Sequence, residues 1–296
     1  MVVTQELRRR AFLFGIAAGA TGLASRMPPA RAADAPSAVC LEWTSAEMLL
    51  SLGITPRAVA DIAGYRVWAV SPPLPESVLD LGSRGEPSME RIATIKPDLI
   101  VTASGYGLDA NRLQRFAPVE TLKLYEGSAT ALSDTAREFV RLAAHLGRRP
   151  QAEERIAKLS TDLAAMRAEL ATRKLPRVAV VSLFDDRHAR VYGRNGLFQD
   201  VLDQLGVENA WTGATSAWGF ATVSFEKLVT LGDCIIVSLQ PVPANVKIRI
   251  QQSRLWAALP AVRRQQVINI PAVWPFGGIA AADRFAGFLR GSLLRL

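Results

Sequence analysis

The sequence predicts an α/β protein with two α/β lobes joined by one long backbone helix. Short apolar segments alternate with helical segments on both sides of a region, 128–174, where the apolar spacing is helical throughout. The chain has 296 residues, of which 49% are hydrophobic, enough for a large core or for two lobes. We therefore expect a first lobe at 33–147, a connecting helix at 148–174 and a second lobe at 175–296.

The first lobe is expected to begin with a short apolar strand at 38–41. A helix should follow it, with Thr44 or Ser45 as the N-cap. Further strands are expected at 57–60 and at 97–102, with a helix opening at Glu90 between them. The apolar run of 97–102 is typical of a buried strand in a parallel sheet.

The connecting helix is expected to start near Gln151, because Gly147 and Pro150 interrupt the helical pattern before it. Its apolar residues recur three or four positions apart, at Ile156, Leu159, Leu163, Met166 and Leu170. One stiff helix between lobes permits little hinge closure, so we expect a shallow, largely preformed ligand cleft. Beyond it, strands are expected at 178–183, 234–238 and 267–270.

Residues 1–32 have the composition of a cleavable export signal. Arg8, Arg9 and Arg10 precede a short apolar stretch, which ends at Ala30-Arg31-Ala32, a small-residue cleavage pattern. The run that starts at Arg9 is similar to the twin-arginine consensus. An amphipathic anchor helix is the alternative, although no repeated polar face is present. With the signal removed, we expect the chain to lie free in the periplasm.

Removing the signal also changes the charge. Five of the 35 basic and one of the 27 acidic residues lie in 1–32, which leaves 30 and 26 and a net charge of +4. No basic cluster interleaved with aromatic residues remains, so we expect no nucleic-acid partner. The two cysteines, Cys40 and Cys234, each stand in an apolar run, which favours two buried free thiols over a disulfide.

Catalytic and metal-site patterns are weak in this sequence. The two histidines, His145 and His188, are far apart, whereas a zinc or manganese site usually needs two or three. We therefore expect no metal site, and Asp185 to His188 should form a polar turn. No nucleophile elbow, zinc-protease motif, P-loop or dinucleotide fingerprint occurs, so no catalytic residue is assigned.

The aromatic residues give a stronger signal for a binding site. Several of the 6 tryptophans stand beside Gly, Pro or polar residues, as in Trp218-Gly219 and Trp274-Pro275-Phe276. An aromatic residue on a loop more often lines a site than one in a periodic apolar stripe. We expect at least three tryptophans to face a cleft, although packing is the default for each one alone.

Arg84 and Tyr106 are the candidate polar contacts of that cleft. Both lie in loops beside strands, where α/β folds place their ligand sites. An arginine offers five donors in a rigid fork, and a tyrosine hydroxyl adds one more. The alternative for Arg84 is a surface ion pair with Glu86.

A dispersed set of segments, in order along the chain, resembles the periplasmic ferric hydroxamate-binding proteins of Gram-negative bacteria, the ferrichrome carriers with a helical backbone. These segments are Leu41-Glu42-Trp43, Leu52-Gly53-Ile54, Tyr65 to Trp68, Pro72 to Pro75, Gly105-Tyr106-Gly107, Asn195 to Gln199, Ala210-Trp211, Trp218-Gly219 and Pro271 to Trp274. The resemblance implies a substrate-binding protein of an ABC importer, monomeric and without a cofactor, whose ligand is an iron(III)–hydroxamate siderophore.

The resemblance also implies roles for individual residues. Arg84 and Tyr106 would hydrogen-bond the hydroxamate oxygens, and an aromatic wall would comprise Trp43, Trp68, Trp218 and Trp274, with Ser216 and Phe276 beside it. Thr102 stands where the ferrichrome carrier has Trp, Ser216 replaces Asn and Phe220 replaces Ser. These three departures imply a pocket that is wider on one side and drier on the other.

Glu90 and Glu226 match the family's permease-docking carboxylates, one for each lobe. As acidic residues at helix starts, they could equally act as favourable helix-dipole caps. The alternatives for function are a haem or cobalamin carrier on the same scaffold, or a periplasmic hydrolase.

Overall fold

The computed structural model describes residues 36–106, 109–126 and 130–296, and within them the strands form two five-stranded sheets. The export signal expected at 1–32 lies outside the described residues. Among the residues described, no helix is long and apolar enough to cross a membrane. Strands and helices alternate in both halves, so the expectation of an α/β fold with two sheets and a long intervening helix is confirmed.

The first sheet is entirely parallel, in the order β3-β2-β1-β4-β5. Its strands are β1 (Ala38–Cys40), β2 (Ala58–Val59), β3 (Leu79–Asp80), β4 (Leu99–Ala103) and β5 (Val119–Leu122). The central strands β1 and β4 are buried along their length, as the apolar run at 97–102 predicted. Its helices are α1 (Trp43–Ser51), α2 (Ile62–Gly64), α3 (Met89–Ile95), α4 (Ala110–Leu113) and the π-helical turn Tyr65–Ala69.

Helix α1 has its N-cap two residues before the first expected position. The capping residue is Glu42, whose carboxylate accepts hydrogen bonds from the backbone N–H of Thr44 (2.6 Å) and of Ser45. The prediction of Thr44 or Ser45 as N-cap was therefore wrong. A glutamate can cap a helix here because the buried side chain curls back to the first free backbone donors.

The second sheet is mixed, in the order β10-β9-β6-β7-β8. Strands β6 (Val178–Leu183), β9 (Ile235–Leu239) and β10 (Val267–Ile270) are parallel, close to their expected bounds. Strands β7 (His188–Tyr192) and β8 (Phe220–Ser224) add an antiparallel extension that the sequence reading did not anticipate. The helices outside this sheet are α8 (Phe225–Val229), α9 (Ala244–Gln252), α10 (Arg254–Ala258) and α11 (Pro260–Arg263).

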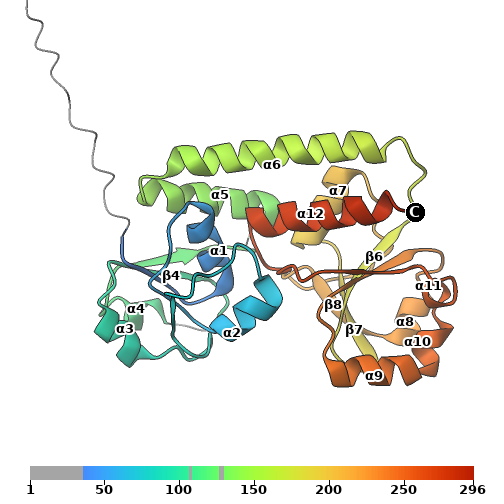
Figure 1. The fold of residues 1–296 in the computed structure, drawn as a ribbon, viewed down its shortest axis with the longest axis horizontal. Helices are drawn as coiled ribbons and strands as arrows, with labels where there is room; N and C mark the ends of the chain where they lie inside the picture. Colours follow the sequence, from blue (N-terminus) through green and yellow to red (C-terminus); the bar gives the residue numbers. More distant parts are fainter. Residues whose placement is uncertain (1–35, 107–108, 127–129) are drawn as a thin grey trace, which may run out of the picture. The chain divides into compact units, whose positions relative to one another are not determined.

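A layer of helices lies along one side of both sheets (Figure 1). It comprises α5 (Ala131–His145), α6 (Arg149–Leu170), α7 (Leu197–Leu205) and α12 (Ile279–Leu293). Helix α6 has 22 residues, roughly 33 Å at 1.5 Å per residue, and has Pro150 in its first turn instead of before it. It packs against α5, α7 and α12, so the long helix is one member of a packed layer.

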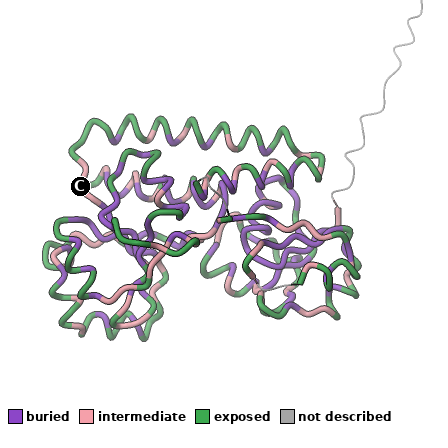
Figure 2. Tube along the Cα trace, turned by 180° about the vertical axis from the view of Figure 1, so that it is seen from behind, coloured by how far each residue is buried: buried purple, intermediate pink, exposed green. Residues whose placement is uncertain are grey.

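One apolar cluster runs through the helical layer and both sheets. It includes Val101 of β4, Leu163 of α6, Phe285 of α12 and Val237 of β9. Figure 2 shows the buried residues concentrated in the strands and in the inner sides of these helices. This shared core fixes the cleft between the two sheets, because moving one sheet would open a closely packed interior.

Candidate functional site

A cavity of about 370 Å³ lies between loops of the first sheet and the strand ends of the second. From the first come Trp43, Trp68 and Arg84. From the second and its following loops come Ser182, Leu183, Phe184, Arg190, Tyr192, Leu239, Gln240, Pro241, Pro243, Val273, Trp274 and Pro275. Three tryptophans thus line one cavity, although only Trp274 lies in a loop, since Trp43 begins α1 and Trp68 lies in the π-helical turn.

The guanidinium of Arg84 lies against aromatic rings in this cavity. Its Cζ atom is 3.6 Å from the centroid of Trp43 and 5.2 Å from that of Trp274. Its Nε atom lies 3.6 Å from Oδ2 of Asp61, which caps α2. The expected alternative, an ion pair with Glu86, is not formed. Stacking on rings and a partly exposed carboxylate hold the guanidinium in place and leave its outer edge free.

Two buried donors at this cavity have no partner among the described residues. They are Nη1 of Arg84 and the indole Nε1 of Trp274. A buried N–H without a partner costs free energy, and such groups are rare in folded proteins. By contrast, Nε1 of Trp43 donates to the Asp61 carbonyl oxygen at 3.0 Å. Both donors therefore belong to side chains that line the cavity and have hydrogen-bonding capacity left unused.

Tyr106 and Trp218 meet beside this cavity, from opposite sides. Their rings are 6.1 Å apart and nearly perpendicular, and Tyr125 lies 5.3 Å from Trp218. Gly105 permits this approach, because its φ is +86° and a Cβ there would lie 2.6 Å from a ring atom of Trp218. Phe276 completes the cluster, with its centroid 5.5 Å from Trp218 and 5.1 Å from Trp274.

The hydroxyl of Tyr106 is neutral throughout the ordinary pH range. Burial raises the pKa of Tyr106 far above its usual value, and the charge of Glu42 raises that pKa further, with Arg84 opposing both. A neutral phenol can donate a hydrogen bond, whereas a phenolate could only accept. Tyr106 therefore adds a donor beside the free edge of Arg84.

Of the other residues singled out in the sequence, Trp68 lines the cavity, whereas Ser216 and Thr102 do not. Trp68 is 39% exposed and lines the cavity. Ser216 is exposed in a turn, where its backbone N–H donates to the Phe220 carbonyl oxygen at 2.9 Å, and it does not line the cavity. Thr102 is 3% exposed inside β4 and also stands outside the lining.

The cavity is lined by a second arginine, Arg190, which the sequence analysis did not identify as a site residue. Arg190 lies on β7, and its Cζ atom is 4.8 Å from the ring centroid of Phe220. Phe220 is one of the three positions that depart from the family pattern. Arg190 makes no ion pair among the described residues. The signal was the alternating sequence His-Ala-Arg-Val-Tyr of 188–192, which places Ala189 and Val191 in the core.

Glu90 and Glu226 are both exposed, in the first turns of α3 and α8. A hydrogen bond from Ser224 lowers the pKa of Glu226, so that its carboxylate is charged near neutral pH. Figure 1 shows α3 and α8 beside different sheets and away from α6. Both carboxylates are thus available on the surface.

The cysteines and histidines take no part in the cavity. Cys40 and Cys234 are buried free thiols, as predicted, and burial raises the pKa of both. Asp185 accepts backbone hydrogen bonds from Arg187 and His188, at 2.7 and 2.5 Å, which is the predicted polar turn. Among the described residues, no cluster of three His, Cys, Asp or Glu is arranged to hold a metal ion.

Comparison with known proteins adds relatives that share the whole architecture. A family model described as periplasmic binding protein matches residues 38–273. The chain is 34% identical over 264 residues to the iron(3+)-hydroxamate-binding protein FhuD of Escherichia coli (strain K12), covering 89% of each chain. It is 25% identical over 186 residues to the vitamin B12-binding protein of Salmonella typhimurium, covering 62% of this chain and 65% of the relative.

A solved structure matches the fold closely. The siderophore-binding protein FhuD of Vibrio cholerae, crystallised with Fe3+-Desferal, superimposes with a TM-score of 0.82 at 29% identity. The match covers 88% of this chain and 98% of that one. The similarity therefore includes both sheets and the helical layer.

Proposed function

Because this chain belongs to the family of periplasmic binding proteins, we propose that it captures an iron(III)–hydroxamate siderophore and delivers it to an ABC permease. The family consists of substrate-binding proteins and not of enzymes. The relative that is 34% identical is named for iron(3+)-hydroxamate binding, and the matching solved structure holds Fe3+-Desferal. A cobalamin carrier is less favoured, since that match covers only 62% of this chain.

One observation carries the proposal: Nη1 of Arg84 is buried without a partner among the described residues, in a cavity walled by tryptophans. Three hydroxamates wrap Fe(III) in six oxygens with no net charge on the iron core. Such a ligand needs donors for its partly negative oxygens and apolar surface for its carbon skeleton. Arg84, with Tyr106 beside it, supplies the donors, and Trp43, Trp68 and Trp274 supply the surface.

The protein need not ligate the iron itself. Arg84 offers only donors, and the neutral hydroxyl of Tyr106 can donate to a siderophore oxygen. The siderophore keeps all six iron sites, and the protein recognises the outside of the complex. A triply charged catecholate complex would call for more basic groups than the cavity's Arg84 and Arg190.

We further propose a periplasmic monomer that docks on its permease through Glu90 and Glu226, with Trp218, Phe276 and Ser216 bordering the ligand. The likeness to periplasmic relatives supports the location. The exposure of both carboxylates supports docking. Charge complementarity of this kind would guide the encounter more than add affinity.

A fluorescence-quenching panel tests the ligand class directly. Ferrichrome, ferrioxamine B, a ferric catecholate and haem are titrated into the protein, whose cavity tryptophans report binding. We expect saturable quenching by the hydroxamates at the lowest concentrations. Arg84→Ala should weaken that binding by about tenfold to a hundredfold, since hydrogen bonds to charged groups contribute about 1.5–3 kcal/mol.

The matched control is Arg57→Ala, which removes an exposed guanidinium outside the cavity. It should bind like the parent protein. Haem or catecholate binding tighter than both hydroxamates would overturn the proposed ligand class. Unchanged ferrichrome affinity in Arg84→Ala would remove Arg84 from the site.

A further inference from the structure

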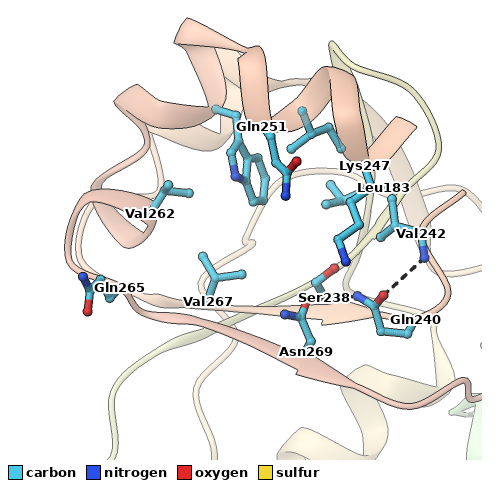
Figure 3. A pocket seen from close by; sticks show the side chains of 12 residues that line it. Leu183, Ser238, Gln240, Val242, Lys247, Gln251, Val262, Gln265, Val267 and Asn269 are labelled. Carbon is cyan, nitrogen blue, oxygen red and sulfur yellow. Dashed lines mark hydrogen bonds between the residues drawn. The ribbon is translucent and has the colours of Figure 1, made fainter. Parts of the chain in front are cut away.

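A second cavity, of about 360 Å³, lies within the second half of the chain (Figure 3). It is enclosed by one face of the parallel strands β6, β9 and β10 and by helices α9 to α11. Trp256, Val262 and Val267 provide apolar surface. This is the sheet face opposite to the helical layer, because Val181 and Ile236 of this face belong to a separate apolar cluster.

The floor of this cavity carries a buried hydroxyl without a partner. Ser238 is 1% exposed, and its Oγ atom has no hydrogen-bond partner among the described residues. The register of β9 and β10 places Asn269 next to Ser238 on the same face. Oδ1 of Asn269 accepts from Nε2 of Gln240 at 2.9 Å, which leaves the amide nitrogen of Asn269 free to donate.

The ammonium group of Lys247 lies on the same side of the cavity as Ser238 and Asn269. Lys247 extends from α9 into the cavity, with its amino end toward Ser238 in Figure 3. It forms no ion pair with a described carboxylate. An ammonium, a hydroxyl and an amide N–H that converge on one space form a donor set for a carboxylate.

This cavity adjoins the first one. Leu183, at the end of β6, and Gln240, just after β9, line both. The second cavity therefore extends along one face of these parallel strands and meets the first cavity at their carboxyl ends, where ligands of open α/β sheets usually bind. A ligand seated on Arg84 could extend an arm past Leu183 and Gln240 into the second space.

We infer that the second cavity is a subsite for the iron-free arm of the siderophore, and that the arm it accepts is aliphatic and ends in a carboxylate. The inference rests on the proposed function and names the substrate class more narrowly. The carboxylate accepts from Lys247, Ser238 and Asn269, and its methylene groups rest on Trp256 and Val267. A cationic arm is disfavoured by Lys247.

Three ferrioxamines with the same iron core test this inference. Ferrioxamine E is cyclic and has no free arm, ferrioxamine G is its opened form with a terminal amine and a terminal carboxylate, and ferrioxamine B has an acetyl group in place of that carboxylated arm. We expect ferrioxamine G to bind this protein roughly three- to tenfold more tightly than ferrioxamine B. Lys247→Met should abolish that preference and leave the affinities for B and E unchanged, because an exposed ammonium contributes about 1 kcal/mol.

Ser238→Ala is the second variant, and it should reduce the preference for G by a smaller factor. It removes a buried hydroxyl that has no partner, so the fold does not depend on it. Lys174→Met, an exposed lysine that lines neither cavity, is the charge-matched control and should keep the preference.

The outcomes separate the two proposals. If E, B and G all bind with equal affinity in the parent protein, the subsite is overturned and hydroxamate binding stands. The subsite is also overturned if G is preferred equally with and without Lys247. If none of the three binds, the proposed function itself fails.

Discussion

Trp68 and Trp211 differ in what surrounds them, although both are tryptophans beside polar segments of the sequence. Trp68 is 39% exposed and lines the first cavity. Trp211 is 7% exposed and packs on glycines, since a Cβ at Gly193 or Gly213 would lie 2.7 or 2.6 Å from its ring. One side chain is placed to contact ligand, and the other stabilises the fold.

Alanine substitution should therefore weaken ligand binding at Trp68 and lower the stability of the fold at Trp211. Trp68→Ala is expected to weaken ferric hydroxamate binding by about tenfold, with little change in the free energy of unfolding. Trp211→Ala is expected to lower the free energy of unfolding by about 3–5 kcal/mol, the usual loss for a buried tryptophan, with ligand affinity unchanged. Iron-siderophore titration and urea denaturation of each variant measure the two quantities. Equal ligand affinities in the two variants would contradict the assignment.

The candidate ligand contacts could be predicted from sequence only where a loop context marked them. Arg84 and Tyr106 stand in such loops, and the sequence marked both as candidates; Arg84 lines the cavity and Tyr106 lies beside it. Arg190 was missed because it belongs to a short half-buried strand whose pairing partner, β8, lies about thirty residues further along the chain. Its position in the cavity depends on that long-range pairing, which local periodicity does not encode.

The helices show a similar division between local and distant causes. The break at Gly147 is local, and it correctly separated α5 from α6, whose first turn contains Pro150. The cap of α12 is distant: Oε1 of Glu47, in α1, accepts from the backbone N–H groups of Gly278, Ala280 and Ala281 at 2.9, 3.1 and 3.2 Å. No pattern within α12 could have identified a cap more than two hundred residues away.

This distant cap makes stability depend on pH. Burial raises the pKa of Glu47 from its ordinary 4.5 to about 7, although the three backbone hydrogen bonds oppose the rise. The folded protein therefore binds a proton that the unfolded chain releases between about pH 4.5 and 7. The contribution of protonated Glu47 to the free energy of unfolding is fully present below about pH 4.5 and is lost as pH rises toward 7.

Glu47→Gln should flatten this dependence. The amide keeps an oxygen for the three N–H groups and, like the protonated acid, carries no charge, so it should reduce the fall in unfolding free energy between pH 5 and pH 8 by roughly 3 kcal/mol. Urea denaturation across that range measures it. Asp200, whose pKa burial raises to about 6, leaves a residual fall of the same sign. Glu154→Gln, on the exposed side of α6, is the control and should follow the parent curve. A Glu47→Gln curve as steep as the parent's would exclude Glu47 as the source.

The layer of α5, α6, α7 and α12 connects the two sheets more firmly than the single helix expected from sequence. Glu47 bridges α1 to α12, and Asp200 of α7 accepts from the backbone N–H of Leu132 in α5 at 2.7 Å. These contacts, together with the shared apolar cluster, oppose hinge motion between the sheets. The spacing between α3 and α8, which carry Glu90 and Glu226, should therefore be nearly the same with and without ligand.

A fixed spacing predicts that docking and ligand capture can be separated by mutation. Glu90→Lys combined with Glu226→Lys should leave siderophore quenching unchanged, because neither residue lines either of the two proposed ligand cavities. The same double variant should reduce siderophore-dependent iron uptake at least tenfold in cells where this chain is the sole carrier, since it reverses both charges proposed to guide docking. Each single variant should give a partial loss of uptake.

Glu154→Lys, an equal charge change on α6, is the control and should transport like the parent. Full uptake by the double variant would show that the two carboxylates serve only their own helices, and loss of quenching would show that they shape the cleft.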